Sequence, residues 1–265
     1  MERIASKENA KIKTFIKLLS TRDYRCETGC FVCDGVRLCL QAAESGVAVM
    51  QFFATAEALL KHQSEAKRIL DVAVESFEIT GQIAQKMSAQ KTPQGFFCIC
   101  RRQQPVLPAE TIKSGGRYVV IHDLQDPGNI GTIIRTAQVL GADGVFLSQN
   151  CPDIFSPKLL SSSMGGVFEH NIVCYESFGE LAELLKAAGV PTVAFALSDE
   201  AREVVRCNFS TGGAVVIGNE GSGLPDDVIA LCSTTAIIPM KGNPGSLNAA
   251  AAAAIAIWEL VGRGS

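Results

Sequence analysis

The 265-residue sequence lacks the long apolar stretch that a membrane-spanning helix requires. Its longest apolar run, Ala249 to Trp258, is well short of the roughly 18 residues needed for a span. Met1 to Lys17 mixes lysines with apolar residues and contains no signal-peptide core. We therefore expect a cytoplasmic protein that has no membrane partner.

The sequence also has little that indicates a metal ion or a phosphate-binding loop. Its three histidines, His62, His122 and His170, share no metal-ligand spacing, so we expect core or surface roles for them and no metal site. Neither G-x-x-x-x-G-K-[ST] nor G-x-G-x-x-G occurs. The ten cysteines are dispersed and are expected to be reduced, mostly buried residues.

Net charge gives no direct sign of a nucleic-acid partner, because 24 basic against 27 acidic residues leave −3. The distribution along the chain changes this view. Residues 1–102 hold 15 Lys+Arg and 11 Asp+Glu, a balance of +4, whereas residues 103–265 hold 9 and 16, a balance of −7. A local positive field attracts a polyanion. A solvated helix face is the alternative for four of these lysines, Lys7, Lys11, Lys13 and Lys17.

Two domains are expected. In residues 1–102, helical spacing at Lys7–Leu19 is followed by a strand at Phe31–Val32, a helix at Gly35–Ser45 and a strand at Val49–Ala54. Residues 103–116 carry two prolines and a Gly-Gly pair without apolar periodicity, which predicts a linker. Residues 117–265 form the second domain.

The second domain alternates short apolar strands with helical stretches. This pattern predicts an α/β domain with a largely parallel sheet covered on both faces, and ligands bind beyond the C-terminal ends of such strands. The predicted strands are Tyr118–His122, Gly144–Leu147, Asn171–Val173, Thr192–Ala196, Ala214–Ile217 and Ala236–Pro239.

Three of these strands run into loops rich in Gly, Asn, Pro and Ser. In the first loop, Asn129 is a candidate N-cap for a helix over Thr132–Leu140. In the second, three glycines surround the lone carboxylate of Glu220, where backbone N–H groups can approach a ligand. In the third, Ser246 is a candidate cap for a helix over Ala249–Leu260. Each loop alone is also explained as an ordinary turn or cap.

Taken together, the loops contain D-P-x-N-x-G-x-x-x-R (Asp126 to Arg135), G-N-E-G-x-G-L (Gly218 to Leu224) and I-P-M-x-G…S-L-N (Ile238 to Asn248). In this order, they closely resemble the SpoU-type RNA 2′-O-methyltransferases of the SPOUT superfamily, over about residues 117–262. Gly29 to Leu40 resembles the family's smaller substrate-binding domain, although Asp34 stands where a glutamate is usual.

The resemblance implies a C-terminal SPOUT domain with a deep trefoil knot and a smaller N-terminal α/β domain, ribosomal-protein-like and RNA-binding. It also implies S-adenosyl-L-methionine as cofactor, and a homodimer through the C-terminal domain in which the active site borrows from the partner. The cofactor-binding residues that it implies are Leu197, Gly218, Asn219, Glu220, Gly221, Ile238, Met240, Leu247 and Asn248.

The resemblance further implies that Asn129, Arg135, Glu220, Ser246 and Asn248 are catalytic. A free arginine is a poor base near neutrality, so we expect Arg135 to position phosphate or stabilise a developing alkoxide. Only RNA offers a 2′-hydroxyl, which excludes DNA as substrate. The predicted RNA-binding residues are Arg22, Arg25, Arg37 and Arg135.

Ribosomal RNA, most simply 23S rRNA, is the favoured target, because the thiostrepton-resistance enzymes of the family share this two-domain layout. Transfer RNA and a non-catalytic RNA-binding role stay open as alternatives. A third alternative is Cys26-x3-Cys30-x2-Cys33, which has the cluster spacing of radical S-adenosylmethionine enzymes. A strand over these residues opposes it, because Cys30 and Cys33 would then face opposite sides.

Overall fold

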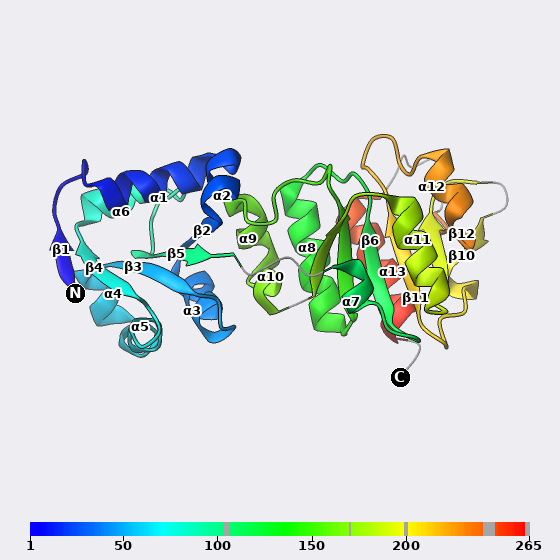
Figure 1. Cartoon of the computed structure of the whole chain (residues 1–265), viewed down its shortest axis with the longest axis horizontal. Helices are drawn as coiled ribbons and strands as arrows, with labels where there is room; N and C mark the ends of the chain where they lie inside the picture. Colours follow the sequence, from blue (N-terminus) through cyan, green and yellow to red (C-terminus); the bar gives the residue numbers. More distant parts are fainter. Residues whose placement is uncertain (103–106, 170, 199–200, 241–246, 263–265) are drawn as a thin grey trace. The chain divides into compact units, whose positions relative to one another are not determined.

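The computed structural model describes residues 1–102, 107–169, 171–198, 201–240 and 247–262. The chain forms two compact units (Figure 1). The first comprises Met1–Gln104 together with Asp153–Phe168, and the second comprises Pro105–Pro152 together with Glu169–Ser265. The segment Asp153–Phe168, which sequence analysis left within the second domain, thus packs with the first unit.

The first unit is built on a five-stranded mixed sheet. The strands run in the order β1 (Glu2–Ile4), β4 (Glu75–Ile79), β3 (Val49–Thr55), β5 (Phe96–Arg101) and β2 (Cys30–Asp34). β1, β4 and β3 are parallel, and β5 is antiparallel to both β3 and β2. The helices are α1 (Ala10–Ser20), α2 (Arg22–Thr28), α3 (Val36–Glu44), α4 (Ala56–Lys61), α5 (Gln63–Leu70), α6 (Gly81–Met87), α9 (Pro157–Ser163) and α10 (Gly166–Glu169).

The opening helix, predicted over Lys7–Leu19, is confirmed as α1 over Ala10–Ser20. α1 starts one residue after Asn9, whose side chain accepts a hydrogen bond from Lys11 N at 2.8 Å and so caps the helix. Ile12, Phe15 and Leu18 recur at helical spacing and are buried against the sheet. The lysine-bearing face of α1 stays toward solvent.

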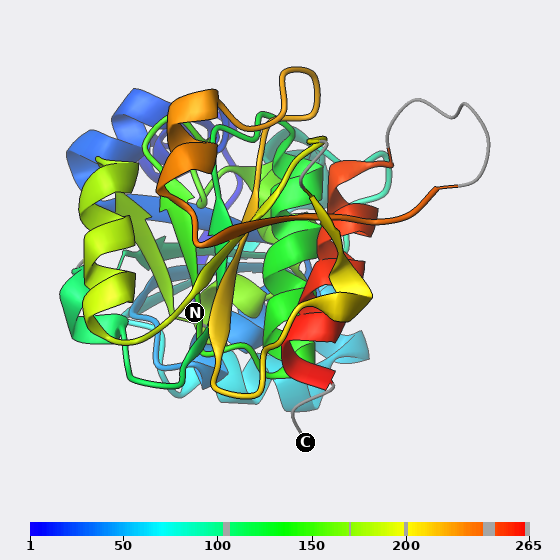
Figure 2. The ribbon, with the colours of Figure 1, turned by 90° about the vertical axis from the view of Figure 1, so that its right-hand side faces the viewer.

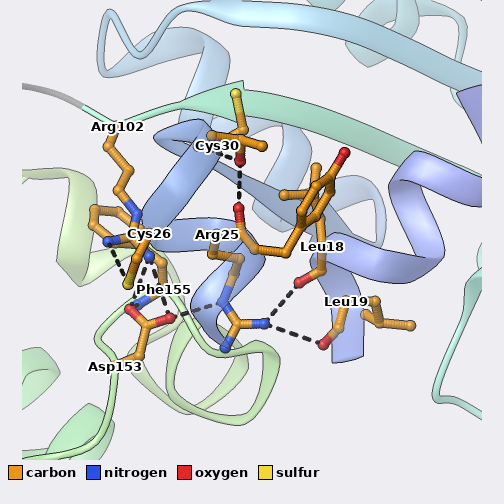
Figure 3. A network of polar contacts seen from close by, with 10 residues as sticks. Leu18, Leu19, Arg25, Cys26, Cys30, Arg102, Asp153 and Phe155 are labelled. Carbon is orange, nitrogen blue, oxygen red and sulfur yellow. Dashed lines mark hydrogen bonds and ion pairs between the residues drawn. The ribbon is translucent and has the colours of Figure 1, made fainter. Parts of the chain in front are cut away.

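A buried ion-pair network holds the segment Asp153–Phe168 within the first unit (Figure 3). Arg25 Nε donates to Asp153 Oδ2 at 2.7 Å, and Arg102 Nη2 donates to Asp153 Oδ1 at 3.2 Å. The Arg25 and Asp153 side chains are only 5% and 7% exposed. Phe155 stacks on Phe31 with ring centroids 4.5 Å apart.

This network corrects one sequence-based prediction. Arg25 was expected to contact RNA, but its guanidinium is buried and also donates to the Leu18 carbonyl at 2.7 Å. A buried guanidinium whose hydrogen bonds go to protein groups serves packing. Arg22 and Arg37 are exposed and remain available to a ligand.

The second unit contains a seven-stranded sheet in which every pairing is parallel. This confirms the predicted parallel α/β architecture. All six predicted strands are present, and the two-residue β10 is an addition that is too short for a pattern to reveal. The order is β10 (Arg202–Glu203), β12 (Thr234–Ile237), β9 (Thr192–Phe195), β11 (Gly213–Ile217), β6 (Arg117–Ile121), β7 (Gly144–Ser148) and β8 (Ile172–Tyr175).

Helices cover both faces of this sheet (Figure 2). α11 (Phe178–Ala187) and α12 (Asp226–Leu231) pack on one face, and α8 (Pro127–Leu140) and α13 (Ala249–Gly262) lie together on the other. A short helix, α7 (Pro108–Thr111), lies in the predicted linker, and the 3₁₀ turn η1 (Val204–Arg206) contacts α13. The alanines of α13 permit its close approach to α8.

One helix start differs from the predicted cap. α8 begins at Pro127 because Asp126 is its N-cap, with Asp126 Oδ1 accepting from Asn129 N at 2.9 Å. Asn129 was predicted for this role and instead lies inside the first turn. Ser246, the predicted cap of α13, lies outside the described residues. Asn248 Oδ1 accepts from the Ala250 and Ala251 amides at the start of that helix.

The implied knot stays a prediction. None of the helices in the described residues is both long enough and apolar enough to cross a bilayer.

Candidate active site

Described residues of the three predicted loops meet beyond the C-terminal ends of β6, β11 and β12. Glu220 lies at their centre and accepts three hydrogen bonds from the first loop. Its carboxylate receives Gln125 N at 3.2 Å, Asp126 N at 3.1 Å and Asn129 Nδ2 at 3.1 Å. Two loops that are more than 90 residues apart in sequence are therefore joined by one side chain.

These bonds also set the charge of Glu220. Partial burial would raise the pKa of its carboxyl, but hydrogen bonds from its own amide, Asn129, Gln125 and Asp126 outweigh burial and leave the pKa below its usual value. Glu220 is therefore ionised at neutral pH and can only accept hydrogen bonds.

Asn248 connects the third loop to the same group. Its Nδ2 donates to Asn129 Oδ1 at 3.1 Å, while its own Oδ1 accepts from the start of α13. Because Asn129 Nδ2 faces the Glu220 carboxylate, both amide orientations are fixed by their partners. Asn248, Asn129 and Glu220 form one directed chain of hydrogen bonds.

Asp123 is a second centre, which sequence reasoning missed. It has a left-handed backbone with φ of 54°, and its carbonyl accepts from Asn219 Nδ2 at 2.8 Å. Its carboxylate accepts from Ser148 Oγ at 2.6 Å and from Asn150 Nδ2 at 3.0 Å. Burial opposes ionisation, but these donors and nearby His122 lower the Asp123 pKa overall. The available signal was its position directly after strand β6.

A pocket of about 430 Å³ opens beside this network. Its lining includes the second loop, where a side chain at Gly218 would place a Cβ 2.5 Å from the Gly223 carbonyl carbon. Leu197, Met240 and Leu247 also line it, although all three apolar side chains are exposed, Leu197 by 85%. A pocket of this size, with backbone polar groups and uncovered apolar side chains, suits a small organic cofactor.

A second, open pocket of about 580 Å³ lies alongside. It is lined by Gln125, Asp126, Asn129, Glu220 and Asn248. Glu220 lines both pockets, so a ligand in each would meet at this residue.

The predicted cofactor residues fall into this arrangement with one difference. Asn248 lines the open pocket, whereas the others line the 430 Å³ pocket: Leu197, Gly218, Asn219, Glu220, Gly221, Ile238, Met240 and Leu247. Of the predicted catalytic residues, Asn129, Glu220 and Asn248 come together. Arg135 lies exposed on α8 and lines neither pocket, and Ser246 is outside the described residues.

Other candidates line neither pocket. His122 Nδ1 is 2.8 Å from the Tyr175 hydroxyl, which gives the imidazole a protein partner. Of the N-terminal cysteines, Cys26 is exposed and Cys33 fully buried, and the period of β2 turns Cys30 and Cys33 to opposite faces. In the part of the chain that the structure describes, no three His, Cys, Asp or Glu residues are grouped to hold a metal.

A parallel α/β unit with a pocket of cofactor size and an amide–carboxylate network at its strand ends fits an enzyme that binds a small organic cofactor. Residues 116–258 match the SpoU rRNA Methylase family, and residues 9–98 match an MRM3-like substrate binding domain. The chain belongs to the SpoU rRNA Methylase family.

Two curated relatives are similar along nearly the whole chain. The 23S rRNA (guanosine(2553)-2′-O)-methyltransferase RlmP of Bacillus subtilis is 30% identical, over 99% of this chain and 100% of the relative. The 23S rRNA (uridine(2479)-2′-O)-methyltransferase of Streptomyces viridochromogenes is also 30% identical, over 98% and 91%.

Solved structures agree with this. An AdoMet-bound rRNA methyltransferase from Sinorhizobium meliloti has a TM-score of 0.87 at 26% identity, over 98% of this chain and 97% of that one. The SpoU methyltransferase AviRb from Streptomyces viridochromogenes, in complex with AdoMet, has a TM-score of 0.85 at 28% identity, over 97% and 98%.

Proposed function

We propose that this protein transfers a methyl group from S-adenosyl-L-methionine to a ribose 2′-hydroxyl of 23S ribosomal RNA. The observation that carries the proposal is the hydrogen-bonded chain Asn248–Asn129–Glu220, placed where two pockets share one residue. One pocket is of cofactor size and the other is open to a large substrate. Relatives that match the chain end to end are named as 23S rRNA 2′-O-methyltransferases.

The 430 Å³ pocket is the proposed cofactor site. The backbone of Gly218 to Gly221 would hold polar groups, and Leu197, Ile238, Met240 and Leu247 would cover apolar ones. When bound, S-adenosyl-L-methionine supplies an electrophilic methyl group on a sulfonium. The protein's own task is to orient the ribose hydroxyl and to exclude competing water.

The amides of Asn129 and Asn248 are suited to that task. Each side-chain NH₂ has two hydrogens and uses one in the bonds described, so one donor per amide is left for a ligand in the open pocket. Donors held in fixed positions stabilise an oxygen as negative charge develops on it. Ionised Glu220 accepts a hydrogen bond from Asn129 and so orients this pair. Among the described residues, its carboxylate is the one that belongs to the lining of both pockets.

A homodimer through the second unit is part of the proposal. α8 and α13 pack together and carry three exposed apolar side chains, here called the apolar stripe: Val139 is 72% exposed, Ile255 38% and Trp258 56%. Arg135 is exposed one helical turn from Val139. A dimer through this stripe would cover the apolar groups and bring Arg135 to a partner's site, where it would position RNA phosphate or stabilise the alkoxide.

RNA recruitment is assigned to the first unit, with residues 1–102 as the substrate-binding domain. Its local charge balance is +4, and Arg22 and Arg37 are exposed cations on it. The match of residues 9–98 to a substrate binding domain supports this division.

Methyl transfer from labelled S-adenosyl-L-methionine to purified RNA tests the proposal. Ribosomal RNA and transfer RNA from cells lacking the protein are compared as substrates, and the product is digested to nucleosides. We expect label in 2′-O-methylnucleosides of 23S rRNA. Label found only in tRNA would contradict 23S rRNA as the substrate. Label on a base would overturn the assignment to the ribose. Cofactor binding without methyl transfer would favour a non-catalytic role.

A further inference from the structure

Two side-chain amides beside the open pocket are not used by the proposed chemistry. Gln125 lines this pocket together with Asn129, Glu220 and Asn248. Asn150 follows strand β7 and contacts Gln125 through its backbone carbonyl. Both residues are exposed, and both belong to the second unit.

The orientation of the Gln125 amide is determined by its partners. Its Nε2 donates to the Asp123 carbonyl at 2.9 Å and to the Asn150 carbonyl at 3.1 Å. A carbonyl oxygen can only accept, so the NH₂ group must face both of them. Both amide hydrogens are thereby used, and Oε1 is the end that remains for a ligand.

The Asn150 amide is fixed in the same way. Its Nδ2 donates to Asp123 Oδ2 at 3.0 Å. Partial burial works against ionisation of Asp123, but its hydrogen-bond donors lower the pKa of this carboxyl, so it is an acceptor at neutral pH. Neither Gln125 Oε1 nor Asn150 Oδ1 has a hydrogen-bond partner among the residues that the structure describes.

Two acceptors without a described partner thus belong to residues joined by a hydrogen bond, and one of them, Gln125, lines the open pocket. Among the four RNA bases, only guanine has two adjacent donors, N1–H and the N2 amino group, on its Watson–Crick edge. Adenine and cytosine place one amino donor beside an acceptor, and uracil places one donor between two acceptors. Acceptors that are left unpaired by a wrong base penalise its binding.

We propose that Gln125 and Asn150 form a base-recognition subsite that selects guanosine as the methylated nucleotide. This inference rests on the proposed function of the adjacent site. The two relatives of equal identity are named for a guanosine and a uridine, so overall likeness does not choose the base. The choice of guanosine rests on the two acceptors, Gln125 Oε1 and Asn150 Oδ1.

The test uses the full-length protein and 23S rRNA from cells that lack it. After transfer and digestion, the labelled product is expected to be 2′-O-methylguanosine. Short transcripts around the mapped position then carry guanosine or inosine, which lacks the N2 amine. Wild-type kcat/KM is expected to be about 10-fold higher for guanosine, since a lost base-edge contact removes discrimination of that order.

Variants assign the discrimination to the two amides. In Gln125→Ala or Asn150→Ala, the guanosine-to-inosine ratio is expected to fall toward one in at least one of them, while cofactor affinity is unchanged. Gln149→Ala is the matched control, because Gln149 is an exposed neighbouring amide whose described hydrogen bond is made only by its backbone. A merely structural role would lower both rates together and leave the ratio intact.

The outcomes separate the two proposals. A different 2′-O-methylnucleoside as product, equal rates on guanosine and inosine, or an unchanged ratio in both variants would overturn the subsite while leaving the methyltransferase proposal standing. Failure of the wild-type protein to methylate any RNA would instead contradict the proposed function, and the subsite with it.

Discussion

Each of the two units contains a network of charged side chains. The networks differ in how much hydrogen-bonding capacity their side chains keep for a ligand. In the first unit, Asp153 and Arg25 are almost completely buried, and described hydrogen bonds link them to protein groups. In the second, Glu220 and Asn129 lie at an open pocket and retain hydrogen-bonding capacity. Charged groups that are enclosed by protein partners stabilise packing, whereas those with spare donors or acceptors at a pocket can act on a ligand.

The largest effect is expected from Asp153→Ala in the first network. This substitution leaves two guanidiniums without their shared carboxylate, and breaking a buried ion pair costs about 3–5 kcal/mol. The free energy of unfolding, measured in urea, is expected to fall accordingly. Cofactor binding by the second unit should persist under native conditions.

The exposed ion pair of Glu8 with Lys13 provides the control for that experiment. Glu8→Ala is expected to leave stability unchanged, because solvent screens an exposed pair. Equal effects of the two substitutions would contradict a structural role for the buried network.

The second network is tested by Glu220→Ala, which should affect turnover. Three hydrogen bonds from Gln125, Asp126 and Asn129 lose their acceptor, so the reactive groups lose their relative positions. Methyl transfer to rRNA is expected to fall about 100-fold or more, with little change in urea stability. Asp227→Ala, an exposed carboxylate on α12, is the control. Retention of the parental rate by Glu220→Ala would remove Glu220 from the active site.

The exposed stripe on α8 and α13 gives a third test. Trp258 is the single tryptophan of the chain, so its fluorescence reports directly on this surface. Trp258→Glu is expected to weaken dimerisation at least about 10-fold, as loss of a central aromatic anchor does. Sedimentation velocity of this variant and of Val72→Glu, an exposed apolar site in the first unit, provides the comparison. A wild-type monomer with solvent-exposed Trp258 emission would contradict the interface.

The smallest effect is the pH dependence of the second network. The Glu220 pKa is lower in the folded chain than its usual 4.5, so the carboxylate contributes stability above that value. This contribution is lost as the pH falls through the lowered folded pKa. Stability is therefore expected to depend slightly less on pH below about pH 5 in Glu220→Gln. An identical pH profile for variant and wild type would show that the hydrogen bonds do not favour the ionised form.

Much of the second unit could be predicted because parallel strands are short, uniformly apolar and followed by distinctive loops. The first unit was less accessible, since β1, β4 and β5 carry no comparable loop motifs and pair across distant parts of the chain. No sequence pattern indicates that Asp153 pairs with Arg25 over 128 positions. A count of charges does not show which side chains are buried. Arg25 was predicted to bind RNA, but it is buried and serves packing.

The candidate site shows the same division. The motifs identified Glu220, Asn129 and Asn248, but they did not reveal Asp123 or the orientations of Gln125 and Asn150, which depend on hydrogen bonds between separate loops. The return of Asp153–Phe168 to the first unit also affects experiment design. Deleting residues 1–102 would uncover Phe155, so Arg22→Ala and Arg37→Ala are cleaner tests of RNA recruitment.

The most direct test of the central claim is a map of 2′-O-methylation in RNA from cells that contain the wild-type protein, the Glu220→Ala variant or no protein. We predict one 23S rRNA ribose that is methylated only with the wild type. Identical maps in all three cells, or a methyl group that persists with Glu220→Ala, would contradict the assignment of this site.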